Sequence, residues 1–217
     1  MLWIANQTRP DLAYDACVLS NSLKDATVAD IVKTNKVIRK MQQNKSFLTF
    51  SKLNEIENST LLTFSDASFK SLHEGAWHGG YMIFLSDILW QSRKIKRVVK
   101  STLAAECLVL QEASESAYYL KTILNEILCV SDTHVNIDCY TDNKSLHDSL
   151  YSSKTLEEKR LILDEAIIKD MIQRKEIRQV KWITSDKQIA DPLTKATSSS
   201  EKLRSVLQRG NVGNLLQ

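Results

Sequence analysis

Thr63-Phe64-Ser65-Asp66-Ala67-Ser68-Phe69 alternates apolar residues with small polar ones, which is the pattern of a half-buried β-strand. Asp66 falls in the middle of this predicted strand. A carboxylate there costs free energy unless it is hydrogen-bonded or binds a metal ion. The stretch therefore predicts a strand that carries a functional acid, and the remaining chain is interpreted around it.

Three later stretches repeat the pattern of an acid set among apolar or small residues. They are Leu103-Ala104-Ala105-Glu106-Cys107, Cys139-Tyr140-Thr141-Asp142-Asn143 and Gln188-Ile189-Ala190-Asp191-Pro192. Magnesium prefers carboxylate oxygens together with water and substrate oxygens. We therefore expect the four acids to converge on a divalent-metal site that cuts a nucleic-acid backbone.

The composition is that of a globular protein able to bury a sizeable core. The 217 residues are 43% hydrophobic and 25% charged, and they suit one domain with an appendage or two small domains. No apolar run has transmembrane length, and the N-terminus does not resemble a signal peptide. The four cysteines lack metal-binding spacing, so we expect buried free thiols and an intracellular protein, in the cytoplasm or the nucleus.

Positive charge is concentrated in one short run, although the formal net charge is only +3. The run contains Arg93, Lys94, Lys96, Arg97 and Lys100. Such a run is often a solvated loop. Its place between two suspected acids favours a second interpretation, in which it offsets their repulsion of phosphate.

Periodicity divides the chain into helices and strands. Residues 1–45 are predicted to be mostly helical, with an apolar stripe at Val28, Ile31, Val32 and Ile38, and a polar linker follows at 54–59. The predicted strands are 47–50, 61–67, 76–85, 88–91, 135–140 and 177–183, with a tight turn at 86–87. The later predicted helices are 101–130, 145–151, 156–175 and 201–209.

The helix boundaries come from capping signals. Ser101 or Thr102 is a predicted N-cap, and Gly210 is a predicted stop after the last helix. Between 185 and 193, a capping box at 185–188 and the Asp191-Pro192 pair are competing helix starts. The buried side of 156–175 is predicted to contain Leu156, Leu163, Ile167 and Met171.

The predicted order of elements defines the fold class as α/β. A meander of three strands followed by alternating helices and strands implies a mixed five-stranded sheet flanked by helices, with an N-terminal helical extension. In such a sheet Asp66 and Asp142 become neighbours, and Glu106 and Asp191 lean over the same edge.

The four acidic motifs together resemble the ribonuclease H domain of copia-type LTR retrotransposon Pol polyproteins. The resemblance rests on Phe64-Ser65-Asp66-Ala67-Ser68, on 101–106, on Tyr140-Thr141-Asp142-Asn143 and on 188–195. Trp90-Gln91-Ser92-Arg93-Lys94 is similar to that family's third strand. The resemblance implies a ribonuclease H-like fold that hydrolyses the RNA strand of an RNA–DNA hybrid with magnesium.

The N-terminal part resembles the end of the family's polymerase and the connection that follows it. The motifs are 8–14 and Asn35-Lys36-Val37-Ile38-Arg39. We therefore expect three regions: a helical connection segment at 1–58, a ribonuclease H-like domain at 59–197, and a C-terminal helix and tail at 198–217. Because the polymerase aspartates are missing, we expect a fragment, a truncated reading frame or a copy in host use.

The expected site has two Mg²⁺ ions, with Mn²⁺ as an alternative. Two-metal phosphodiester hydrolysis needs hard oxygen ligands that hold the ions ~4 Å apart. We assign Asp66 as the bridging ligand, Glu106 and Asp142 to the ion at the leaving oxygen, and Asp191 to the ion that activates water. Three of the acids also have a structural interpretation, since Asp142 and Asp191 are possible helix caps and Glu106 a possible surface residue, whereas a mid-strand Asp66 is hard to explain structurally.

Nucleic-acid contacts are predicted around this site. Ser68, Asn143 and Ser145 are candidates to hydrogen-bond the 2′-hydroxyl of RNA, or else ordinary turn and cap residues. Phosphate contacts are expected from the basic run, at Arg93, Lys94, Lys96 and Arg97. His73 and His78 are expected to be structural.

Two other functions compete with an active hybrid nuclease. One is a catalytically silent, domesticated module that keeps the fold and binds nucleic acid or a protein partner. The other keeps the two-metal site but acts on a different substrate, as integrases and resolvases do. The presence of all four acids in this order favours the ribonuclease H interpretation. A polymerase domain or a protein partner is expected at the N-terminal helices, and no membrane.

Overall fold

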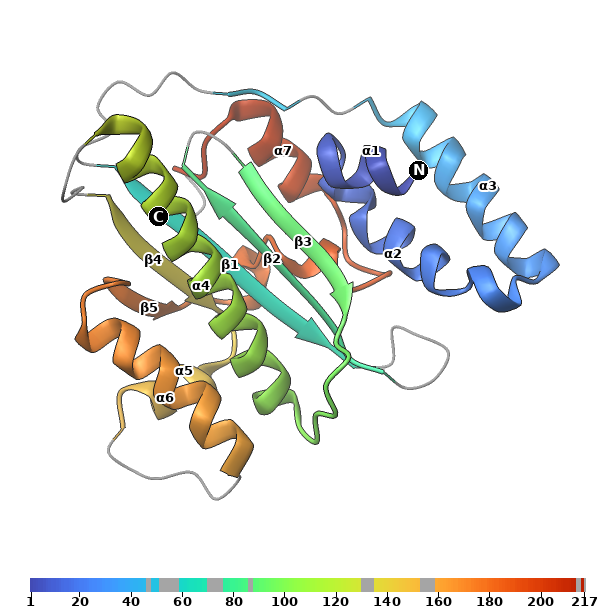
Figure 1. The fold of residues 1–217 in the computed structure, drawn as a ribbon. Helices are drawn as coiled ribbons and strands as arrows, with labels where there is room; N and C mark the ends of the chain where they lie inside the picture. Colours follow the sequence, from blue (N-terminus) through green and yellow to red (C-terminus); the bar gives the residue numbers. More distant parts are fainter. Residues whose placement is uncertain are drawn as a thin grey trace.

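A computed structural model of the chain describes residues 1–45, 48–50, 59–69, 76–85, 88–129, 135–152, 159–213 and 216. Its centre is a five-stranded sheet in the order β3-β2-β1-β4-β5 (Figure 1). The strands are β1 (Thr60–Ser68), β2 (His78–Phe84), β3 (Ile88–Lys94), β4 (Asn136–Thr141) and β5 (Gln179–Trp182). β1 pairs antiparallel with β2 and parallel with β4. The predicted mixed five-stranded sheet is confirmed.

One face of the sheet is covered by the helices that follow the meander. α4 (Thr102–Leu128) crosses β1 and β2, and α6 (Lys159–Gln173) lies beside it, with α5 (Lys144–Leu150) nearby (Figure 1). The core of this layer includes Leu61, Ile83, Leu110 and Ile137, all at most 1% exposed. Apolar residues every three or four positions along α4 produce this continuous contact.

The opposite face is covered by α7 (Glu201–Arg209) and by the segment before it. That segment contains two 3₁₀ turns, η4 (Ser185–Lys187) and η5 (Asp191–Leu193). Phe64 and Tyr140 stack on this face, with ring centroids 4.8 Å apart, and Leu203 and Leu207 of α7 belong to the same cluster. The even-numbered residues of β1 thus face the C-terminal segment, which is the side toward which Asp66 projects.

The N-terminal helices lie beyond the β3 edge (Figure 1). They are α1 (Leu2–Gln7), η1 (Pro10–Leu12), α2 (Ala13–Asn21), η2 (Leu23–Asp25) and α3 (Val28–Gln43). The indole of Trp90 on β3 donates to the Ala5 carbonyl at 2.9 Å. Arg9 and Asp11 form a buried bidentate ion pair, with both N–O distances 2.8 Å. Arg9 also donates to the Met41 carbonyl, so this pair connects η1 with α3.

The capping signals fixed two helix boundaries as expected. The Ser101 side chain accepts from the Ala104 amide and begins α4. Gly210 ends α7 in the left-handed region, with φ of 68°. The two competing starts at 185–193 both form, but as the short turns η4 and η5, so neither begins an α-helix.

The predicted buried side of α6 was wrong for two of its residues. Leu163 is 65% exposed and Ile167 38% exposed, whereas Met171 is buried as expected. The buried face instead includes Asp164 and Glu165. These acids share the buried face with Leu161 and Ile168, and they are compensated, since Arg97 pairs with Asp164 and Lys169 with Glu165, each at 2.8 Å.

Other expectations failed locally or lie outside the described residues. The apolar stripe of α3 is largely exposed, with Val28 at 78%, Ile31 at 60% and Val32 at 49%. Residues 48–50 are irregular, although a strand was predicted at 47–50. The 86–87 turn, residues 54–58 of the linker, His73 and Leu156 lie outside the described residues.

The cysteines are free, as predicted. Cys17, Cys107 and Cys139 are buried, but Cys129 is exposed at the left-handed C-cap of α4. Within the described residues, no helix combines the length and the apolar composition that crossing a bilayer requires.

Candidate metal centre

The register of the sheet positions Asp66 beside Asp142. Phe64 pairs with Tyr140 in the parallel ladder of β1 and β4, and each acid follows its member of this pair by two residues. Across the antiparallel ladder Asp66 faces Gly80 of β2. Asp66 is 1% exposed, so the predicted mid-strand acid is buried at the centre of the sheet.

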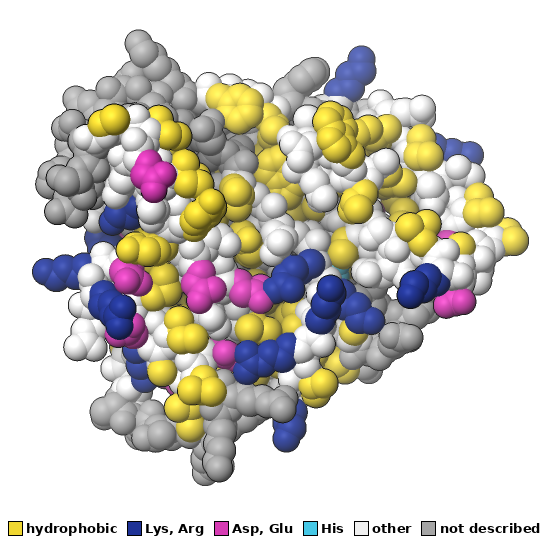
Figure 2. All heavy atoms as spheres, in the orientation of Figure 1, with side chains coloured by type: hydrophobic (Ala, Val, Ile, Leu, Met, Phe, Trp, Pro, Cys, Tyr) yellow, Lys and Arg dark blue, Asp and Glu magenta, His cyan; other side chains and the backbone are white. Residues whose placement is uncertain are grey.

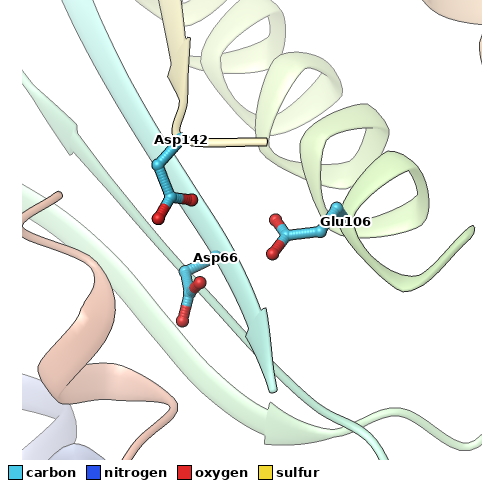
Figure 3. A group of neighbouring side chains, drawn as sticks. All are labelled: Asp66, Glu106 and Asp142. Carbon is cyan, nitrogen blue, oxygen red and sulfur yellow. The ribbon is translucent and has the colours of Figure 1, made fainter. Parts of the chain in front are cut away.

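Three of the four predicted acids come together. Asp66 projects from β1, Glu106 from the second turn of α4, and Asp142 from the residue after β4, and their side chains point toward one another (Figure 3). One carboxylate oxygen from each lies within 4.8 Å of the others. The predicted neighbourhood of Asp66 and Asp142 is therefore present, and Glu106 is not a surface residue, being 6% exposed.

Burial and mutual repulsion perturb the acids of this cluster. Burial raises the pKa of Asp66 to about 6, although the Lys195 ammonium opposes the rise. Burial also raises the pKa of Glu106 well above its usual range, and the charges of Asp66 and Asp142 add to that rise. Like charges held together in a low-dielectric site disfavour full ionisation, and this is the electrostatic situation that a bound cation relieves.

The oxygen set fits a hard divalent cation. All three side chains of the cluster are carboxylates, the ligands that Mg²⁺ and Mn²⁺ prefer over thiolate or imidazole. Among the described residues, the buried Glu106 Oε2 has no hydrogen-bond partner. A buried acceptor without a partner is costly, and the Glu106 carboxylate points into the cluster (Figure 3), so this oxygen is suited to ligation.

Asp191 lies beside the cluster but outside the mutually close group. Lys195 Nζ lies 2.7 Å from Asp191 Oδ1 and 3.2 Å from Asp66 Oδ1, so an ammonium separates the two carboxylates. Burial raises the pKa of Asp191, and Lys195 lowers it. The Thr194 hydroxyl donates to Asp66 Oδ2. Both Asp66 oxygens thus have partners from the C-terminal segment.

Hydrogen bonds attach the C-terminal segment to the sheet beside Asp66. The Gln188 amide donates to the Ser65 carbonyl at 2.9 Å. The Ser68 and Ser92 hydroxyls donate to the Thr194 and Leu193 carbonyls, each at 2.6 Å. These bonds connect β1 and β3 to the turn that contains Asp191, which fixes Asp191 and Lys195 relative to the sheet.

Gly80 permits this close approach. A Cβ atom at Gly80 would lie 2.7 Å from Leu193 Cβ and 3.0 Å from Thr194 Cγ2. Contacts that short require a neighbour to move, so the absence of a side chain at position 80 is what allows Thr194 to reach Asp66.

The small polar residues predicted to bind the 2′-hydroxyl have structural partners or are exposed. Ser68 is occupied with the Thr194 carbonyl. The Asn143 side chain accepts from the Leu146 amide at 3.0 Å and caps α5, which is its predicted alternative role. Ser145 is exposed in the first turn of α5, close in sequence to Asp142.

The predicted basic residues lie at the end of β3 and in the segment that leads to α4. Figure 2 shows Lys and Arg side chains gathered over this part of the molecule. The residues predicted to contact phosphate are Arg93, Lys94, Lys96 and Arg97. Arg93 pairs with Glu112 on α4, and Arg97 pairs with Asp164 on α6, whereas Lys96 is exposed. Part of the run thus attaches the segment to neighbouring helices.

His78 has the structural role expected for it. It is fully buried, its Nε2 lies 2.8 Å from Ser92 Oγ, and its ring meets Tyr14 edge-on at 5.0 Å. Burial lowers its pKa to about 4, so the ring is neutral at physiological pH.

Sequence reasoning gave no role to Thr194, Lys195 or Gly80. The spacing of Asp191 and Lys195 at i and i+4 is a signal for an ion pair. The contacts of Thr194 and Lys195 with Asp66 join residues that lie 128 and 129 positions apart in the sequence, and the spacing alone does not predict them.

No protein-family model matches the chain. Among curated proteins, it is similar to the "Retrovirus-related Pol polyprotein from transposon RE2" of Arabidopsis thaliana, with 28% identity over 198 residues. The corresponding protein from transposon RE1 of the same plant is 26% identical over 198 residues. Each match covers 88% of this chain but 13% of the relative, so the chain spans about an eighth of their length.

Among solved structures, the chain is similar to the N-terminal ribonuclease H domain of a Mycobacterium tuberculosis protein. The TM-score is 0.48 at 14% identity, covering 68% of this chain and 96% of that one. The curated relatives named above are transposon Pol polyproteins, the class of protein that the four acidic motifs resemble.

Proposed function

We propose that this chain is a metal-dependent ribonuclease that hydrolyses the RNA strand of RNA–DNA hybrids, as part of a retrotransposon Pol polyprotein. The observation that carries the proposal is the cluster of the buried Asp66 and Glu106 with the half-buried Asp142, whose carboxylate oxygens lie within 4.8 Å of one another. The similarity to Pol polyproteins supports the same assignment.

The proposed metal ligands are the three clustered acids, with Asp191 as a further ligand. Mg²⁺ is the proposed ion, in two copies, and Mn²⁺ would satisfy the same oxygens. When bound, such ions polarise the scissile phosphate and lower the pKa of the attacking water. Among the residues that the structure describes, Glu106 Oε2 has no hydrogen-bond partner, and this supports the assignment, because ligation would satisfy a buried acceptor.

The chain's own residues contribute position and electrostatics. Asp66 is paired with Gly80 in the β1–β2 ladder, and Thr194 and Lys195 contact its two carboxylate oxygens, so the carboxylate has little freedom to move. Glu106 is fixed by the buried N-terminal part of α4, and Ser185 holds Asp142 by donating to its Oδ2 at 2.7 Å. Preorganised carboxylates require little rearrangement during reaction, which is the main protein contribution to such catalysis.

Contact with the nucleic-acid backbone is assigned to the basic run. Lys96 and Lys100 are exposed and free to approach phosphates, whereas Arg93 and Arg97 must exchange Glu112 and Asp164 for phosphate. Phosphate contacts of this kind position a duplex without reading its sequence. We therefore expect hybrid binding that depends on salt and not on base sequence.

We further propose that the N-terminal helices contact a polymerase domain or a protein partner. The exposed apolar residues are Leu23 at 74%, Val28 at 78%, Ile31 at 60% and Val32 at 49%. They occupy η2 and the first half of α3, away from the sheet. Exposed apolar groups that lie together are typical of protein contacts.

The deciding experiment is cleavage of a hybrid labelled on its RNA strand, in Mg²⁺, by wild type and by Asp66→Asn. Asp15→Asn is a matched control, since Asp15 pairs with Lys40 in α2 and α3, far from the cluster. Cutting by wild type and by the control, but not by Asp66→Asn, would support the nuclease and its site together. Hybrid binding without cutting by folded wild type would instead support a catalytically silent module.

A further inference from the structure

Lys195 lies where two of the proposed ligands meet. Its Nζ contacts Asp66 Oδ1 at 3.2 Å and Asp191 Oδ1 at 2.7 Å, and its side chain is 36% exposed. An ammonium shared by two carboxylates performs the electrostatic work of a cation at that position. The Asp66–Asp191 pair therefore has a positive charge of the protein between its carboxylates, whereas Glu106 and Asp142 are not paired with this ammonium.

The position of Lys195 is fixed by its surroundings. The Thr194 and Lys195 amides both donate to the Asp191 carbonyl, at 3.0 and 2.9 Å, so the turn presents the lysine back toward Asp191. The Thr194 hydroxyl takes the second oxygen of Asp66. The bonds from Ser68 and Ser92 hold the same turn on the sheet. The turn that contains Lys195 is thus held in place by hydrogen bonds on several sides, which fixes the lysine beside Asp66 and Asp191.

The carboxylates of Glu106 and Asp142 are not paired with Lys195. Their carboxylate oxygens lie within 4.8 Å of an Asp66 oxygen. Among the described residues, Glu106 Oε2 has no hydrogen-bond partner. The Asp142 carboxylate accepts a hydrogen bond from a neutral group, the Ser185 hydroxyl. Uncompensated carboxylates attract a divalent ion more strongly than carboxylates already paired with an ammonium.

We propose that Lys195 is a positioning residue that serves as the built-in cation between Asp66 and Asp191. The chain then takes up one divalent ion tightly, at Asp66, Glu106 and Asp142, and a second only when Lys195 leaves the Asp66–Asp191 pair. This inference rests on the proposed function. It assigns the second ion to the position between Asp66 and Asp191 that Lys195 occupies. Arrival of a phosphate, which attracts the ammonium, is the event that would release Lys195.

The test is a count of bound Mn²⁺ ions on the full chain, measured by the loss of the free-ion electron paramagnetic resonance signal. Wild type is expected to bind one ion tightly, and Lys195→Met two, with the second bound about tenfold or more tightly than in wild type. Lys195→Arg keeps the charge and is expected to bind one. Lys195→Met combined with Asp191→Asn removes a ligand of the second position and is expected to return to one.

Thermal unfolding provides a second readout that does not depend on activity. In EDTA, Lys195→Met is expected to unfold at a lower temperature than wild type, and Mn²⁺ is expected to restore it. Lys169→Met is the matched control, because Lys169 also pairs with a buried carboxylate at 2.8 Å and its side chain is 35% exposed. Lys169→Met is expected to unfold at a lower temperature than wild type, to bind no additional Mn²⁺, and to stay at that lower temperature when Mn²⁺ is added.

Two results would overturn the inference: a wild type that binds two ions with equal affinity, or a folded Lys195→Met that binds one. The wild-type count alone decides the question if Lys195→Met does not fold. Failure of the proposed function is distinguishable, because it would be seen as a wild type that binds no Mn²⁺, or as binding that Glu106→Gln leaves unchanged.

Discussion

Replacing Gly80 with alanine should disable the candidate site without touching any acid. Gly80 faces Asp66 across β1 and β2, and the added Cβ would lie 2.7 Å from Leu193 Cβ and 3.0 Å from Thr194 Cγ2. Leu193 Cβ is attached directly to the backbone, so a rotamer change cannot relieve the contact. The turn that contains Thr194 must therefore move away from the sheet.

The size of the displacement follows from the contact. Carbon atoms pack comfortably at ~3.5–4.0 Å, so Leu193 must retreat by about 1 Å. Overpacking of this kind costs about 1–3 kcal/mol of unfolding free energy. A misplacement of about 1 Å in catalytic geometry can lower the rate about 100-fold. We therefore expect Gly80→Ala to fold, with a modest stability loss and a much larger loss of hybrid cleavage.

Gly79→Ala is the matched control on the neighbouring residue of β2. Its Cβ would meet side-chain ends on the opposite face, Val109 Cγ2 at 2.6 Å and Ile95 Cδ1 at 3.4 Å. Both variants should lose stability in urea unfolding, but only Gly80→Ala should lose most of its kcat. Equal losses of kcat in the two variants, or full activity in a folded Gly80→Ala, would refute the role given to the Leu193–Thr194 contact.

Three further perturbations test burial and charge. In EDTA, the free energy of unfolding should fall as pH rises from 3.8 to about 6. Burial raises the pKa of Asp66 to about 6, so between these pH values the folded state binds more protons than the unfolded state. A series of melting experiments on wild type and Asp66→Asn measures this slope. Arg9→Ala should cost about 3–5 kcal/mol in urea unfolding, because it leaves Asp11 buried and unpaired. Lys96→Ala with Lys100→Ala should weaken hybrid binding and lower the salt slope by about two.

Each of these perturbations has a control. A pH slope that survives unchanged in Asp66→Asn would contradict the assignment of that titration. Lys33→Ala removes an exposed pair with Asp30 and should cost at most about 0.5 kcal/mol, so a similar loss for both pairs would argue against burial as the cause. Lys24→Ala, at an exposed residue of η2, should leave the salt slope of hybrid binding unchanged.

The sheet and most helix boundaries were predictable because local signals decide them. Alternation of apolar residues fixed β1, the Ser101 cap fixed the start of α4, and Gly210 fixed the end of α7. Three of the four acids were brought together as predicted, because the parallel pairing of β1 and β4 aligns Asp66 with Asp142. The division into three regions stays a prediction.

What failed depends on contacts between residues distant in sequence. The buried face of α6 contains Asp164 because Arg97, from another element, compensates it. The position of Lys195 depends on the docking of a turn whose hydrogen bonds come from β1 and β3. The α3 stripe satisfied the helical period, yet Val28 is exposed, since periodicity does not say which face of a helix a neighbour covers.

The C-terminal attachment of Lys195 also sets an order of assembly. The residues up to Asp142 already contain the whole acidic cluster, in a meander, a helix and one parallel strand, whereas the lysine must be brought back across 129 positions of sequence. Pairings between distant residues form late because closing a long loop is entropically costly. We therefore expect a folding chain to bring its carboxylates together before the Lys195 ammonium lies between them. The divalent ion that we propose for the cluster would relieve this repulsion at that stage and so favour folding.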